Sequence, residues 1–104
     1  MMRVFVSHPG NKREQYFGAR ATQALRAIAE VRFNDEAQEL PLPALVRAAQ
    51  DCDALIAYRQ TPAPEALFAA LPQLVAFLRC AVDIRTVDVA AASCHGVLVT
   101  QATP

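Results

Sequence analysis

Polar residues follow three of the short apolar runs in the sequence, and the types of several of them suit the binding of an anion. Tyr58, Arg59, Gln60 and Thr61 come directly after residues 54–57. A helix predicted to begin near residue 64 would bring the positive end of its dipole close to these side chains. Residues 79–83 follow another apolar run, and residues 7–10 follow the first one. These three groups are where ligand-binding chemistry is predicted.

The arginines near these groups have a second interpretation. Most surface arginines bind no ligand, so Arg59, Arg79 and Arg85 can equally be solvated loop residues. Asp83 can then simply pair with one of them, and an exposed ion pair typically contributes less than about 1 kcal/mol. The residue types alone leave both interpretations open.

The histidines and cysteines form no recognisable catalytic or metal-binding motif. His8 lies in a turn without a carboxylate to orient it, and His95 is predicted to lie in the last turn of a helix, where a positive charge is favourable. Cys80 beside Arg79 suggests a thiol of lowered pKa or, as the preferred interpretation, a buried inert thiol. The cysteines contain no C-x-x-C pair, so reduced thiols in a cytoplasmic protein are expected and no metal is predicted; they are Cys52, Cys80 and Cys94.

Strand and helix patterns alternate along the chain. Short apolar, β-branched runs predict strands at residues 3–7, 31–33, 54–57, 74–78 and 97–100, with helices between them at 12–30, 41–49, 64–71 and 88–96. The first helix is expected to be long and amphipathic, with an apolar face made of Phe17, Ala21, Ala24, Leu25 and Ile28.

This alternation predicts the fold class. Continuous apolar strands separated by helices indicate a parallel sheet covered on both faces. We therefore expect an α/β fold, a flavodoxin-like three-layer α/β/α domain with a five-stranded parallel sheet. Because ligands collect at the carboxyl ends of such strands, the three polar groups are expected on one rim.

Composition excludes several functions. A chain of 104 residues fits one domain, and 54% hydrophobic residues supply its core. The formal net charge is zero, with no basic run, so nucleic acid is not an expected partner. No apolar stretch is long enough for a membrane span. Three glycines, at positions 10, 18 and 96, are not spaced as G-x-G-x-x-G, so this chain itself is expected to bind no cofactor.

The stretch from Leu74 to Pro104 resembles the substrate-binding domain of the D-isomer-specific 2-hydroxyacid dehydrogenases, a family that includes phosphoglycerate, glycerate and formate dehydrogenases. In that family a buried strand leads into a pattern close to R-x-G-V-G-V-D-N-I-D, a helix of small residues, a glycine and another strand. The positions that follow this register are Arg79, Val82, Thr86, Val87, Asp88, Ala90 to Ala92, Gly96, Val97, Val99 and Thr100. The segment ALIAYRQT also looks like the family's strand followed by R-x-T, with Thr61 at the threonine.

The resemblance implies that substrate and cofactor are bound by two different domains. Residues 1–104 would be a single substrate-binding domain whose backbone donors at Cys80, Ala81, Val82 and Asp83 hold the carboxylate of a 2-hydroxy or 2-oxo acid. Arg59, Gln60 and Thr61 would line the distal end of that substrate. NAD or NADP would be bound by a nucleotide-binding domain that is missing from this chain and carries the catalytic residues. The intact protein would be a homodimer.

Three positions depart from the family pattern. Ala81 and Asp83 stand where two glycines are usual, and Arg85 stands where the first aspartate is usual. Glycine permits close approach of a ligand to the backbone, and an aspartate facing an anionic substrate would repel it. The departures therefore bear on substrate preference.

The sequence thus predicts the substrate-binding lobe of an NAD(P)-dependent oxidoreductase that interconverts a D-2-hydroxy acid and a 2-oxo acid, similar to 3-phosphoglycerate dehydrogenase. The chain alone is expected to be inactive. The alternative is a freestanding, non-catalytic flavodoxin-like binding module, in which the rim contacts a partner.

Overall fold

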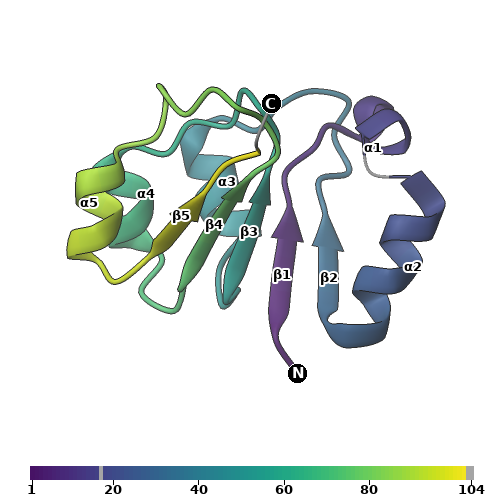
Figure 1. Ribbon diagram of the computed structural model, residues 1–104, viewed down its shortest axis with the longest axis horizontal. Helices are drawn as coiled ribbons and strands as arrows, with labels where there is room; N and C mark the ends of the chain where they lie inside the picture. The colour runs from purple at the N-terminus through teal and green to yellow at the C-terminus, as the bar shows by residue number, and fades with distance from the viewer. Residues whose placement is uncertain (17, 103–104) are drawn as a thin grey trace.

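A five-stranded parallel sheet forms the centre of the molecule, which we describe from a computed structural model over residues 1–16 and 18–102. The strand order is β2-β1-β3-β4-β5 (Figure 1). The strands are β1 (Arg3–Val6), β2 (Glu30–Phe33), β3 (Ala54–Ala57), β4 (Ala76–Arg79) and β5 (Leu98–Thr100). The predicted flavodoxin-like α/β class is confirmed, because the order reverses beside β1 and all neighbouring strands run parallel.

Three helices cover one face of the sheet. They are α3 (Leu42–Ala48), α4 (Glu65–Ala70) and α5 (Val89–Cys94). Alternate residues of the strands point toward them, so Phe5, Leu55 and Phe77 are each at most 2% exposed. Phe77 also meets Phe68 of α4 edge to face, with ring centroids 6.1 Å apart. Burial of each such side chain stabilises the fold by roughly 1.5–3 kcal/mol, and this layer is the main core.

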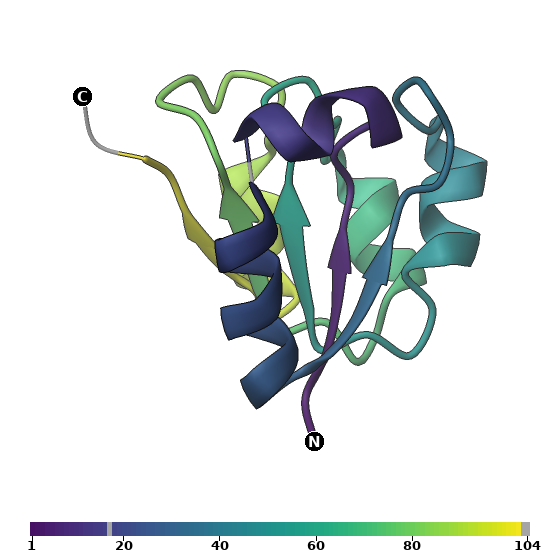
Figure 2. The ribbon, with the colours of Figure 1, turned by 90° about the vertical axis from the view of Figure 1, so that its right-hand side faces the viewer.

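The other face carries two helices where one was predicted. The chain forms α1 (Gly10–Tyr16) and α2 (Gly18–Ile28), which run in different directions (Figure 2). The prediction of a continuous helix was wrong because Gly18 adopts a φ of 72°, a left-handed conformation in which a right-handed helix cannot continue. Phe17, which was expected on its apolar face, lies outside the described residues.

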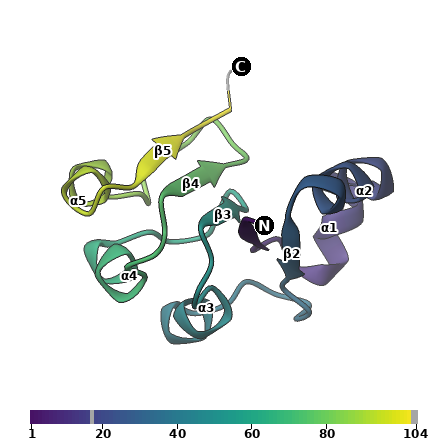
Figure 3. The same ribbon diagram turned by 90° about the horizontal axis from the view of Figure 1, so that it is seen from below.

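The helices α1 and α2 cover only the side of the sheet near β1 and β2. Guanidinium groups of Arg13 and Arg26 lie 4.4 and 5.2 Å from the ring centroid of Phe33 in β2. Over β4 and β5 the same face meets no helix of the described chain (Figure 3). Leu98 there is 65% exposed, and Ile28, predicted to face the core, is 73% exposed. The second helical layer therefore covers less of the sheet than the sequence pattern predicted.

Helix ends follow the predicted signals in the last third of the chain. The Asp88 carboxylate accepts a hydrogen bond from the N–H of Ala91 at 3.0 Å and so caps α5. Gly96 follows the helix with a φ of 73°. The strand before this helix ends one residue later than predicted, so Arg79 belongs to β4. Among the described residues, no helix has both the length and the apolar character needed to cross a membrane.

Candidate functional site

Two loops at the carboxyl ends of β3 and β4 are joined into one surface. Ala63 and Val87 form a parallel bridge, in which the N–H of Ala63 donates to Thr86 and the N–H of Asp88 donates to the carbonyl of Ala63, at 3.0 and 2.9 Å. Such parallel pairing holds the loop after β3 against the loop after β4. The rim predicted from the sequence therefore consists of loops that lie side by side.

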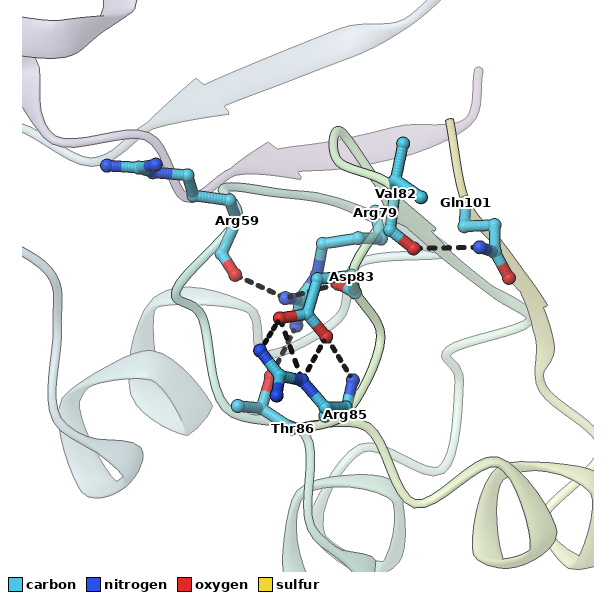
Figure 4. A network of polar contacts seen from close by, with 7 residues as sticks. All are labelled: Arg59, Arg79, Val82, Asp83, Arg85, Thr86 and Gln101. Atoms are coloured by element: carbon cyan, nitrogen blue, oxygen red, sulfur yellow. Dashed lines mark hydrogen bonds and ion pairs between the residues drawn. The ribbon is translucent and has the colours of Figure 1, made fainter. Parts of the chain in front are cut away.

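Arg79 holds the two loops together from inside. Its side chain is at the end of β4 and only 3% of its surface is exposed. The guanidinium donates to the backbone carbonyl of Arg59 and, at 3.0 Å, to the hydroxyl of Thr86 (Figure 4). It also donates to the backbone carbonyl of Thr61. Burial lowers the pKa of Arg79, and the negative charge of Glu39 opposes this. The interpretation of Arg79 as a solvated arginine was wrong.

A buried chain of hydroxyl groups fixes the start of the β3 loop. The Ser7 hydroxyl accepts from the N–H of Tyr58 at 2.9 Å and lies 2.7 Å from the hydroxyl of Thr61. The Thr61 hydroxyl in turn donates to the carboxylate of Glu39. Burial raises the pKa of Glu39, while this hydrogen bond and the charge of Arg79 lower it in part. The sequence did not predict a role for Glu39, because it lies in a polar loop far from Ser7 and Thr61 in the sequence.

The predicted site residues differ in exposure, because Thr61 is buried and most of the others line an open pocket. The Thr61 side chain is 1% exposed and lies beneath the surface, in the hydroxyl chain. An open pocket of about 360 Å³ lies between the two loops and is lined by residues from both of them. Its lining consists of Arg59, Gln60, Ala81, Val82 and Asp83. Five of the seven predicted residues are thus brought together around one concave surface.

The exposure of Cys80 differs from what the sequence suggested. Its residue is exposed, whereas a buried inert thiol was the preferred prediction. Partial removal of water from the thiol raises its pKa, and the charge of Arg79 counteracts this only in part. Its N–H donates to the carbonyl of Ala57 at 2.9 Å and extends the sheet. Cys80 is therefore neither an activated thiol nor a free backbone donor.

The next three residues do offer free backbone donors. In the part of the chain that the structure describes, the N–H groups of Ala81, Val82 and Asp83 meet no intramolecular acceptor. The carbonyls of Ala81 and Val82 are occupied instead, by the N–H of Ala102 at 3.0 Å and the side-chain amide of Gln101 at 2.8 Å. Consecutive N–H groups of this kind can bind a carboxylate. Gln101 was missed because a single polar residue after a strand has no distinctive pattern.

Asp83 and Arg85 form an exposed ion pair in the loop after β4. Arg85 donates to both carboxylate oxygens, and the shortest contact, between Nη2 and Oδ2, is 2.7 Å (Figure 4). The backbone N–H of Arg85 donates to Oδ1 at 2.9 Å. Together these hydrogen bonds lower the pKa of Asp83 to about 2. The alternative in which Asp83 pairs with a nearby arginine is confirmed, and its charge is compensated.

The ion pair with Arg85 should be detectable in the pH titration of Asp83. A carboxylate whose pKa is lowered on folding contributes stability above its ordinary value of 3.8, and this contribution is lost as the pH falls through about 2. We expect the side-chain carboxyl carbon of Asp83 to titrate near pH 2 by NMR, and at a higher pH in an Arg85→Ala variant, which loses the guanidinium but keeps the backbone N–H donor of residue 85. An unchanged midpoint in the variant would contradict the assignment of Arg85 as the cause.

The two histidines have structural positions. His95 ends α5, and its Nε2 lies 2.5 Å from the carboxylate of Glu65 in α4, so it joins two helices. His8 is 1% exposed, its ring lies edge to face with Tyr58 at 5.3 Å, and burial lowers its pKa. The described residues bring no three His, Cys, Asp or Glu side chains together in a way that could hold a metal ion.

Similar folds occur among solved structures of dehydrogenases. A structure described as a D-isomer specific 2-hydroxyacid dehydrogenase, NAD-binding, from Polaromonas sp. JS6 66 has a TM-score of 0.83 at 19% identity and covers 95% of this chain. Phosphoglycerate oxidoreductase from Vibrio cholerae o395 has a TM-score of 0.77 at 24% identity, with 97% coverage. D-lactate dehydrogenase from Escherichia coli has a TM-score of 0.74 at 17% identity, with 98% coverage. The chain spans 29%, 31% and 31% of the lengths of these three structures.

The fold and the paired loops define the class of this protein as an α/β domain with a concave rim at the carboxyl ends of β3 and β4. A comparison with curated protein sequences finds no match. The family model for the D-isomer specific 2-hydroxyacid dehydrogenase, catalytic domain, matches residues 4–104. The chain therefore belongs to the D-isomer specific 2-hydroxyacid dehydrogenase family, as its resemblance implied.

Proposed function

We propose that this chain is the substrate-binding lobe of an NAD(P)-dependent D-2-hydroxyacid dehydrogenase, and that its substrate binds in the pocket between the β3 and β4 loops. The observation that carries the proposal is the run of free N–H groups at Ala81, Val82 and Asp83 along one side of that pocket. These groups would hold the carboxylate shared by 2-hydroxy and 2-oxo acids. Side-chain contacts would then select among the acids.

The far side of the pocket supports a substrate with a second negative charge. Arg59 and Gln60 line it, and both are exposed to solvent. Arginine recognises carboxylate and phosphate groups through paired N–H donors. The negative charge of Asp83 is compensated by Arg85, so it opposes such a substrate less than an unpaired carboxylate would. A phosphorylated or dicarboxylic 2-hydroxy acid, as in a 3-phosphoglycerate dehydrogenase, is therefore the preferred substrate class.

The residues of this chain do not fit a dinucleotide. The three glycines, at positions 10, 18 and 96, lie in separate parts of the fold and form no glycine-rich turn. The nicotinamide cofactor would accept or supply the hydride from a second lobe. This chain would bind the acid, orient its carboxylate on the backbone donors and, together with that lobe, exclude water from the reacting carbon.

The chain itself provides the test. We expect D-lactate and D-2-hydroxyglutarate to shift the amide signals of residues 81–83 in a ¹⁵N NMR titration, with affinities in the millimolar range because half of the cleft is absent. D-lactamide, which keeps the carbon skeleton and lacks the charge, is the matched control, and NADH should leave the spectrum unchanged. In an Arg59→Gln variant the preference for the dicarboxylic acid should disappear. Equal shifts with lactamide, or none at residues 81–83, would overturn the proposal.

A further inference from the structure

We propose that Gln101, which lies outside the pocket lining, is a positioning residue that aims the backbone donors of the β4 loop at the ligand. This inference rests on the proposed function. Its basis is the pair of hydrogen bonds by which the segment after β5 holds the β4 loop. The Gln101 side-chain amide donates to the carbonyl of Val82 at 2.8 Å, and the N–H of Ala102 donates to the carbonyl of Ala81 at 3.0 Å.

Because the peptide bond is planar, these two contacts fix the directions of the N–H groups of Val82 and Asp83. In a trans peptide the C=O and the following N–H point in opposite directions, and the described residues contain no cis peptide. The carbonyls of Ala81 and Val82 point toward residues 101 and 102. The N–H groups on the same two peptide units, those of Val82 and Asp83, therefore point away from this segment. In the view of Figure 4, Gln101 and Arg59 lie on opposite sides of Val82.

The two anchors differ in what they depend on. Ala102 contributes a backbone N–H, which a side-chain substitution leaves in place. Gln101 contributes a flexible, exposed side chain, and its hydrogen bond fixes the peptide unit that carries the N–H of Asp83. The contact from Arg79 to the carbonyl of Asp83, at 3.5 Å, is weak and belongs to the next peptide unit, which carries the N–H of Ile84. The Asp83 donor is therefore the one whose direction depends most on Gln101.

This arrangement couples the path of the chain after β5 to the affinity of the pocket. Loss of the Gln101 hydrogen bond lets the peptide between Val82 and Asp83 rotate, so a bound carboxylate must restrict that rotation. We expect about 3- to 10-fold weaker binding of a 2-hydroxy acid, which corresponds to one ordinary hydrogen bond. The fold should remain intact because Gln101 is exposed and lies outside both hydrophobic cores.

The test compares Gln101→Leu with wild type and with Gln73→Leu, a control at an exposed glutamine that lies far from both loops. D-lactate is titrated into each ¹⁵N-labelled chain, and N–H residual dipolar couplings are measured without ligand. In Gln101→Leu, the dissociation constant should rise by about 3- to 10-fold. The couplings of Val82 and Asp83 should change, while that of Cys80, which is held by Ala57, should not.

The outcomes separate this inference from the proposed function. Unchanged affinity and couplings in Gln101→Leu, with lactate still shifting residues 81–83 in wild type, would overturn the role of Gln101 and leave the binding site standing. Absence of lactate-induced shifts at Val82 and Asp83 in wild type would overturn both. An equal loss of affinity in Gln73→Leu would also refute the inference, because the effect would then not require the hydrogen bond to Val82.

Discussion

Replacement of Arg79 by methionine is expected to lower the free energy of unfolding by about 3–5 kcal/mol. Methionine keeps much of the apolar stem but removes the donors to the carbonyls of Arg59 and Thr61 and to the hydroxyl of Thr86. The two carbonyls would lose their charged partner inside the protein, where 3% exposure of Arg79 leaves little access for water. Urea denaturation monitored by circular dichroism measures the change.

The control for this substitution lies in the same loop. Arg85→Ala removes an arginine whose side chain is 90% exposed and whose carboxylate partner is also exposed, so its cost should be much smaller than that of Arg79→Met. Arg79→Lys should fall between the two variants, because one ammonium group cannot reproduce the fork of donors. Similar midpoints for Arg79→Met and Arg85→Ala would show that Arg79 does not hold the loops together.

The location of the candidate site followed from sequence patterning, and its internal connections did not. Parallel strands end at the same edge of a sheet, so the loops after β3 and β4 were expected to meet. The bonding of Arg79 was not predictable, because an arginine after an apolar run has the same pattern whether it turns outward or inward. Its direction depends on which carbonyls the neighbouring loop presents, and these lie about 20 positions earlier in the sequence.

The prediction of the first helix failed for a different reason. Apolar residues at helical spacing on both sides of Gly18 suggested one continuous element. A glycine in a helix costs only about 1 kcal/mol, so its presence alone does not predict a break. In the structure Gly18 adopts a left-handed conformation, and α1 before it places the guanidinium of Arg13 against the ring of Phe33, a contact between distant positions that helical spacing does not reveal.

Two departures from the family pattern explain each other in the structure. An unpaired carboxylate at Asp83 would repel an anion bound nearby. Arg85, at the position where the family usually has an aspartate, supplies the positive charge that compensates it. Their side chains form one bidentate pair, so the loop has no net charge from these two positions.

Replacement of Ser7 by alanine is expected to destabilise the fold by about 1–3 kcal/mol. The substitution removes the acceptor that the Ser7 hydroxyl provides to the N–H of Tyr58, at a position that is 2% exposed. It also removes the contact with the Thr61 hydroxyl, which is then left with Glu39. The backbone bonds of Ser7, to Ile56 and from the Asn34 side chain, do not depend on the hydroxyl. Thermal and urea unfolding measure the loss.

The effect of Ser7→Ala should extend to the pocket, because Tyr58 directly precedes the lining residues Arg59 and Gln60. Ser93→Ala is the matched control, since Ser93 is an exposed residue of α5, where alanine favours a helix. We expect amide signals of residues 58–61 to shift in Ser7→Ala and to remain in place in Ser93→Ala. If Ser7→Ala unfolds at the wild-type midpoint with unshifted signals, the hydroxyl chain does not position the β3 loop, and its support must come from Arg79 alone.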